Sequence, residues 1–184
     1  MARVALVEPE PASPEVREIY EKVLRGKPGN VQKALAQRPD MLKNFLPFYA
    51  SVGRLLERKL YELVYIRVSM INGCNYCLQH HQAFSKRVGI APEQWAALKA
   101  KDFSAFSPKE QATLTYAEKR TRTPHEVNDQ DFVPLKANFS DAEIVDLHAL
   151  IALVNFTNRF TDPLGLAVEF PEGEGLTPSA ITGA

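Results

Sequence analysis

The chain has 184 residues, with 22 basic and 22 acidic side chains and a formal net charge of zero at pH 7. This balance argues against a nucleic-acid partner, because nucleic-acid binders usually carry a basic surplus that neutralises phosphates. The longest uncharged stretch of the apolar C-terminal half, residues 147–158, is well short of the roughly 20 residues that span a bilayer. Residues 1–14 carry acidic residues and three prolines where a secretory signal would have a basic start and an apolar run, so no secretory signal is expected there. We expect one domain, residues 1–184, in the cytoplasm, with no membrane partner.

The first predicted element is an extended N-terminal arm, residues 1–13, in which prolines disfavour a helix. A helix over residues 14–26 follows, with Ser13 as its N-cap and Pro14 at its first position. Further helices are expected over residues 30–35 and 39–52, and Pro47 should kink or interrupt the latter. The pair of helices over 57–71 and 74–88 is separated by Asn72-Gly73, a turn-forming dipeptide, and the second ends at Gly89.

The second half of the chain also predicts helices. Residues 92–100 form one, and two capping boxes, Ser107 to Glu110 and Ser140 to Glu143, each begin another. A weaker helix is expected around residues 129–137. Because no stretch alternates with the period of a strand, the chain is expected to be all-α. Residues 166–184 mix Pro, Gly, Ser and Thr and should form a C-terminal arm.

Both cysteines lie in one short stretch together with two of the four histidines, Gly73-Cys74-Asn75-Tyr76-Cys77-Leu78-Gln79-His80-His81. Residues three apart on a helix are neighbours, so Cys74 and Cys77 come near disulfide reach. A bridge across so short a loop adds little stability, which favours a reversible redox role. His81, one turn after Cys77, can take its proton, whereas the helix N-terminus favours a thiolate at Cys74. Which thiol is the more acidic stays open at this point.

A carboxylate partner for His81 can be placed by helix geometry. If the helices before and after Asn72-Gly73 fold back on each other, Glu62, about ten residues before the hinge, comes level with His81. Glu62 can then orient His81 and stabilise its charge. In one unbroken helix, Glu62 and Cys74 would lie about 18 Å apart along the axis, and no relay could connect them. The hypothesis therefore depends on the Asn-Gly break.

These residues resemble the signature of the carboxymuconolactone decarboxylase superfamily, in particular its alkyl hydroperoxidase D-like (AhpD-like) branch. That branch has a glutamate twelve residues before the first cysteine of a Cys-x-x-Cys pair and a histidine four residues after the second. The positions that match this spacing or its surroundings are Glu62, Ser69, Asn72-Gly73-Cys74, Tyr76-Cys77, His81 and Gly89. The match is close over about residues 57–89, and a looser likeness continues through Asn155, Asn158, Arg159 and Gly165.

The resemblance implies an all-helical, oligomeric protein, a trimer or hexamer, with the Cys-x-x-Cys site on a helix hairpin. It also implies a thiol peroxidase cycle without a cofactor or metal. Cys77 would attack a hydroperoxide substrate and Cys74 would resolve the sulfenic acid to a disulfide, with Glu62 and His81 as the proton relay. A dithiol protein, thioredoxin-like or lipoyl-bearing, would be the reductant. One departure is Tyr76, which stands where the well-studied alkyl hydroperoxidase has a histidine.

Other interpretations exist for several of these residues. Four ligands crowded on one helix, Cys74, Cys77, His80 and His81, cannot surround zinc tetrahedrally, so no metal site is expected. His80 points about 100° away from His81 and is expected at the surface or at an interface. Tyr65, Ser69 and Tyr76 either line the site or pack in the core.

Two alternative functions are open. One is decarboxylation of a lactone, which needs no dithiol and would survive the loss of both cysteines. The other is a non-catalytic, redox-sensing oligomer, whose mass would depend on the state of the Cys74–Cys77 pair.

Overall fold

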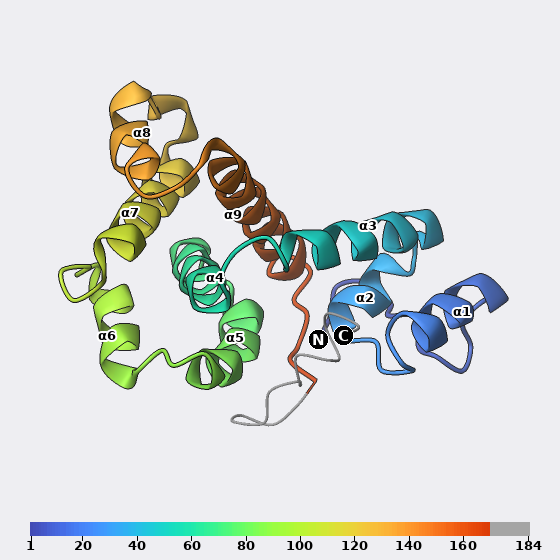
Figure 1. The fold of residues 1–184 in the computed structure, drawn as a ribbon. Helices are drawn as coiled ribbons and strands as arrows, with labels where there is room; N and C mark the ends of the chain where they lie inside the picture. The colour runs from blue at the N-terminus through green and yellow to red at the C-terminus, as the bar shows by residue number, and fades with distance from the viewer. Residues whose placement is uncertain (170–184) are drawn as a thin grey trace.

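The computed structural model describes residues 1–169, apart from the side chain of Ala83, so most of the expected C-terminal arm lies outside the described residues. Within this range the regular structure is helical and no strand is present, which confirms the all-α prediction (Figure 1). The helices are α1 (Pro14–Lys22), α2 (Asn30–Leu35), α3 (Pro39–Val52), α4 (Arg58–Asn72), α5 (Asn75–Arg87), α6 (Pro92–Ala100), α7 (Pro108–Arg122), α8 (Asp129–Lys136) and α9 (Asp141–Thr161). A 3₁₀ turn, Pro124–Glu126, joins α7 to α8.

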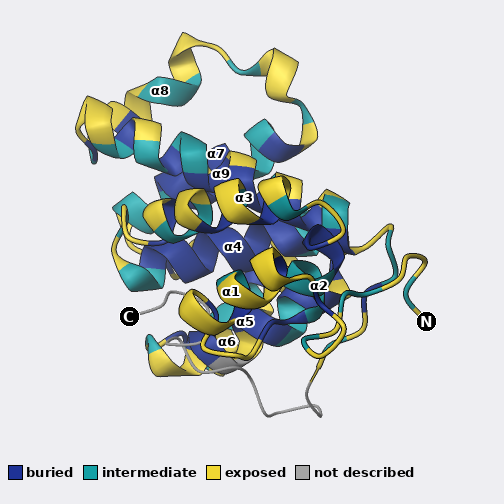
Figure 2. Ribbon diagram, turned by 90° about the vertical axis from the view of Figure 1, so that its right-hand side faces the viewer, coloured by how far each residue is buried: buried dark blue, intermediate teal, exposed yellow. Residues whose placement is uncertain are grey.

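Helix α4 is the centre of the arrangement and packs against α5, α7 and α9 (Figures 1 and 2). Every residue from Leu60 to Ser69 is buried, as expected of a helix with neighbours on all sides. Two of these buried residues are charged. Arg67 pairs with Glu118 of α7 and donates from Nη1 to the Leu98 carbonyl at 2.9 Å, while Glu62 belongs to the site described below.

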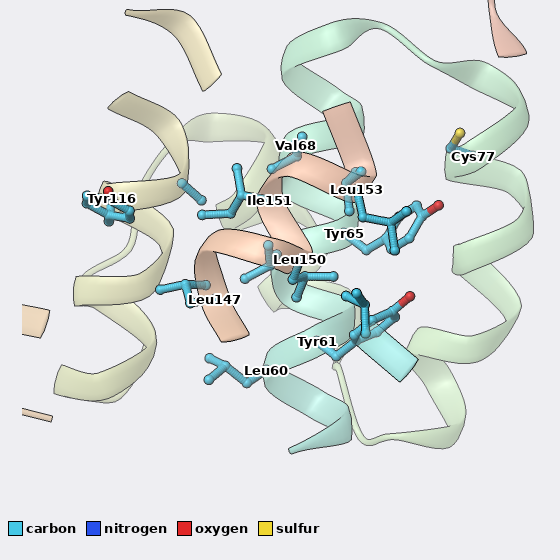
Figure 3. Packing of buried hydrophobic residues seen from close by; sticks show 14 of the residues in the cluster. Leu60, Tyr61, Tyr65, Val68, Cys77, Tyr116, Leu147, Leu150, Ile151 and Leu153 are labelled. Carbon is cyan, nitrogen blue, oxygen red and sulfur yellow. The ribbon is translucent and has the colours of Figure 1, made fainter. Parts of the chain in front are cut away.

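Apolar side chains fill the space between α4 and its neighbours (Figure 3). Leu60, Val64 and Val68 of α4 meet Leu147 and Ile151 of α9, and all five are at most 3% exposed. Burial of each such side chain contributes about 1.5–3 kcal/mol. This packing holds α9 alongside α4 and so places the C-terminal turns of α9 near the end of α4.

The hinge between α4 and α5 follows from one glycine. Gly73 has φ of 70°, in the left-handed region that glycine adopts without strain, and α4 therefore ends at Asn72. The Cys74 N–H closes the helix end by donating to the Ser69 carbonyl at 3.0 Å. Cys74 is then the N-cap of α5, and the two helices fold back on each other, which confirms the predicted helix hairpin.

Two boundaries differ from the prediction. Helix α1 ends at Lys22 rather than near Gly26, because Arg25 and Gly26 adopt positive φ and the Gly26 N–H donates to the Tyr20 carbonyl at 2.8 Å. Helix α3 continues through Pro47 without interruption. Residues 1–13 contain no helix. None of the helices between residues 1 and 169 combines the length and the apolar character needed to cross a membrane.

Candidate active site

The two cysteines lie at the start of α5, and both are free thiols and buried, Cys74 at 0% and Cys77 at 5% exposure. As N-cap, Cys74 accepts a hydrogen bond at its Sγ from the Cys77 backbone N–H at 3.4 Å. Only Cys77 lines the neighbouring cavity. Cys77 is therefore the sulfur that a molecule in the cavity meets, and Cys74 lies behind it.

The two thiols differ in acidity. A hydrogen bond from the Cys77 thiol lowers the pKa of Cys74, and burial acts in the opposite direction. Hydrogen bonds from the Cys77 backbone N–H and the Asn158 amide lower this pKa further. The same thiol–thiol hydrogen bond raises the pKa of Cys77, and burial and the charge on Cys74 raise it further. Cys74 is thus the more acidic of the two thiols, as the helix N-terminus favours, and Cys77 needs a base before it can attack.

The base lies where the folded-back helices were expected to put it. The Glu62 carboxylate, 1% exposed, accepts a hydrogen bond at Oε2 from His81 Nδ1 at 2.6 Å. Arg58 lies 3.7 Å from the other carboxylate oxygen and partly balances its charge. Since Nδ1 is engaged with Glu62, Nε2 is the nitrogen of His81 available to take a proton. The Tyr65 ring stacks on the imidazole at a centroid distance of 3.6 Å and fixes its plane.

A cavity of about 70 Å³ opens in front of Cys77. Its lining is mixed apolar and polar: Val31, Gln32, Phe45, Leu46, Tyr49, Tyr65, Tyr76, Cys77, His80, His81, Thr157 and Thr161. Figure 3 shows Tyr61 and Tyr65 extending from α4 toward the side on which α5 carries Cys77. Tyr65 and Tyr76, both expected as possible lining, thus face the cavity, whereas Ser69 does not. In the described part of the chain, no group of three or more His, Cys, Asp or Glu side chains is arranged to hold a metal ion.

Ser69 instead belongs to a buried amide network behind the cysteines. Asn158 of α9, 1% exposed, donates from Nδ2 to Ser69 Oγ at 3.1 Å and accepts from Asn72 Nδ2 at 3.0 Å. Hydrogen bonding from the Asn158 amide also favours the thiolate form of both cysteines. The looser family likeness included Asn158, but sequence reasoning gave it no role in the site. The available signal was a polar residue on an apolar helix, since buried polar groups need partners.

His80 differs from the prediction that placed it at the surface or at an interface. It is 6% exposed, because the segment after α9 covers this face of α5. His80 Nε2 donates to Glu169 Oε2 at 3.0 Å, and its ring lies 4.3 Å from that of Tyr76. The Tyr76 hydroxyl donates to Glu169 Oε1 at 2.7 Å. Glu169 has no local motif, which is why sequence reasoning missed it.

Residues 39–119 match the model of the Carboxymuconolactone decarboxylase family. The chain is 30% identical over 112 residues to the uncharacterized protein YdfG of Bacillus subtilis (strain 168), which covers 60% of this chain and 76% of that protein. It is 28% identical over 108 residues to the uncharacterized protein YnjA of Escherichia coli (strain K12). That second match covers 58% of this chain and 59% of YnjA.

Solved structures share the fold over nearly the whole chain. An uncharacterized peroxidase-related protein from Silicibacter sp. TM1040 superimposes with a TM-score of 0.80 at 24% identity, over 95% of both chains. The alkylhydroperoxidase AhpD core of a peroxidase-related protein from Ralstonia eutropha JMP134 gives 0.76 at 25% identity, over 91% of this chain and 92% of that one. The debrominase Bmp8, solved with 2,3,4-tribromopyrrole, gives 0.74 at 19% identity, over 92% and 94%. The solved structures show the AhpD-like fold, and the match to the family model together with the identity to YdfG shows that the chain belongs to the carboxymuconolactone decarboxylase family.

Proposed function

We propose that this protein is a thiol peroxidase that reduces hydroperoxides through a dithiol–disulfide cycle of Cys74 and Cys77. The observation that carries the proposal is the buried Glu62–His81 pair, 2.6 Å apart, one helical turn from a cysteine that faces a cavity and holds its proton. A base oriented by a carboxylate beside a protonated thiol is the arrangement that activates a sulfur nucleophile. The likeness to peroxidase-related proteins supports the same activity.

The first step forms a sulfenic acid on Cys77. His81 Nε2 removes the thiol proton, and the charge on Glu62 stabilises the resulting imidazolium. The Cys77 sulfur attacks one peroxide oxygen, the O–O bond breaks, and the other oxygen leaves with a proton as an alcohol or water. In the second step the Cys74 thiolate attacks the Cys77 sulfur, the disulfide forms, and the departing hydroxide takes a proton from solvent and leaves as water. An external dithiol protein, thioredoxin-like or lipoyl-bearing, then reduces the disulfide.

The size of the cavity indicates a small substrate. One water molecule needs at least about 10–15 Å³, so the cavity of about 70 Å³ holds hydrogen peroxide or a short alkyl hydroperoxide. A transient, catalytic disulfide of this kind is compatible with a reducing cytoplasm, which is the compartment we propose. We further propose that the protein works as a homo-oligomer, a trimer or hexamer.

The proposal is tested by stopped-flow consumption of hydrogen peroxide and cumene hydroperoxide by the dithiol-reduced protein, with Cys77→Ser and Cys74→Ser in parallel. We expect rapid oxidation by hydrogen peroxide that Cys77→Ser abolishes, slower oxidation by the bulkier cumene hydroperoxide, and a sulfenic acid that accumulates in Cys74→Ser. A reaction no faster than that of a free thiol would exclude a peroxidase. Lactone decarboxylation that survives in a variant with both Cys74→Ser and Cys77→Ser would then indicate a lyase, and an oligomer mass that changes with the redox state of the pair would indicate a sensor.

A further inference from the structure

The cavity in front of Cys77 is lined by two imidazoles, and each is paired with a carboxylate from a different part of the chain. His81 is held by Glu62 of α4, and His80 is held by Glu169 of the segment that follows α9. The two histidines lie three and four residues after Cys77, so both are its neighbours on α5. The site therefore has two histidine–carboxylate pairs, whereas deprotonation of one thiol requires only one.

The Glu169 carboxylate is held from several directions. Besides His80, it accepts hydrogen bonds from the Tyr76 hydroxyl and from the Asn30 backbone N–H. The Asn30 side chain also donates to the Ala167 carbonyl at 2.8 Å, which fastens the segment that carries Glu169. The side chains of His80 and Glu169 are only 8% and 19% exposed.

These contacts keep Glu169 charged. Burial raises its pKa, but the hydrogen bonds from His80, the Asn30 backbone and Tyr76 outweigh burial and leave the pKa below its ordinary value. A charged carboxylate in hydrogen-bond contact with an imidazole stabilises the imidazolium form, which is the form that can give up a proton.

Breaking a peroxide O–O bond calls for such a donor. The departing oxygen carries the electron pair of the broken bond as hydroxide or alkoxide, a strongly basic leaving group that needs a proton. His81 acts as the base that takes the proton of Cys77, so a second group is needed as the acid. Two titratable groups with separate carboxylate partners can divide the roles of base and acid.

We propose that His80, held by Glu169, donates the proton to the oxygen that leaves when Cys77 attacks a hydroperoxide; this assignment rests on the proposed function. The Cys77 sulfur bonds to one oxygen, the O–O electron pair moves to the other, and that oxygen takes its proton from the His80 imidazolium. His81 has gained the Cys77 proton, and water carries a proton from His81 back to His80. The sum is one thiol and one hydroperoxide converted to one sulfenic acid and one alcohol or water.

The test varies the leaving group. Reduced wild-type protein, His80→Gln and Glu169→Gln are reacted with hydrogen peroxide, with peracetic acid, whose carboxylate leaves without a proton, and with iodoacetamide, which releases iodide. General acid catalysis contributes typically 10²–10⁴-fold, so His80→Gln should slow the reaction with hydrogen peroxide by about 100-fold or more. Its reactions with peracetic acid and iodoacetamide should stay near the wild-type rates. Glu169→Gln should show the same selectivity with a smaller loss.

The matched control is His125→Gln, which alters a histidine whose side chain is 78% exposed. It should leave all three rates unchanged. Equal slowing of all three reagents by both the His80 and the Glu169 variants, or an unchanged rate with hydrogen peroxide, would overturn the assignment while leaving the peroxidase intact. A wild-type protein that reacts with hydrogen peroxide no faster than a free thiol would overturn both.

Discussion

Replacing Glu62 with glutamine tests whether the buried carboxylate promotes proton removal from Cys77. Glutamine keeps the shape of the side chain and can still accept from His81 Nδ1, but the negative charge 2.6 Å from the imidazole is lost. Hydrogen bonds to charged groups contribute about 1.5–3 kcal/mol. At 1.36 kcal/mol for each factor of ten, the reaction with hydrogen peroxide should slow roughly 10- to 150-fold.

The assay is the second-order rate constant for oxidation of the reduced protein by hydrogen peroxide at neutral pH, measured by stopped flow. The matched control is Glu21→Gln, an exposed glutamate on α1, which should react like the wild type. Circular dichroism and urea unfolding establish that the Glu62 variant is folded. A folded Glu62→Gln protein that reacts at the wild-type rate would refute the assignment of the Glu62–His81 pair as the base.

Three further predictions concern the hinge, the thiol pair and the core. Gly73→Ala should lower the free energy of unfolding in urea by about 1–2 kcal/mol, because alanine is strained in the left-handed backbone conformation although nothing lies within 4 Å of an added Cβ. Gly73→Asn should lower it less. An unchanged free energy of unfolding in both variants would contradict the role of Gly73 in the hinge. Cys74 should ionise at a higher pH in Cys77→Ala than in Cys77→Ser, because serine keeps a hydrogen-bond donor to the Cys74 sulfur. The ionisation is followed by the ultraviolet absorbance of the thiolate as the pH is raised, and identical midpoints in the two variants would count against the prediction. Arg67→Met removes the cation of a buried ion pair and should lower the free energy of unfolding in urea by about 3–5 kcal/mol. The loss should lie near the lower end of this range because Glu118 also pairs with Arg122 and Lys101. An unchanged urea midpoint would disprove this prediction.

The parts of the site that could be predicted from the sequence depend on local geometry. A turn-forming pair at Asn72-Gly73 and a constant rise per residue are enough to bring Glu62 level with His81. The distance between them, 2.6 Å, agrees with that calculation. The same local patterns predicted the helices, with errors confined to the end of α1 and to the effect of Pro47 on α3.

The missing parts depend on contacts between distant segments. His80 meets Glu169, and Ser69 meets Asn158, each across 89 residues of sequence. No local pattern indicates which loop or helix turn will cover a given face of α5. The order of the thiol acidities was equally inaccessible, because it depends on a thiol–thiol hydrogen bond and on the Asn158 amide as well as on the helix terminus.

The segment that matches the family model, residues 39–119, contains Glu62, both cysteines and His81, but not all of the cavity wall. Val31 and Gln32 of α2 precede this segment, and Thr157 and Thr161 of α9 follow it, as does Glu169, which holds His80. Evolution can therefore reshape the opening, or exchange the group that anchors His80, through changes at the two ends of the chain while the sulfur chemistry stays intact. We expect relatives to diverge in substrate preference mainly through these ends.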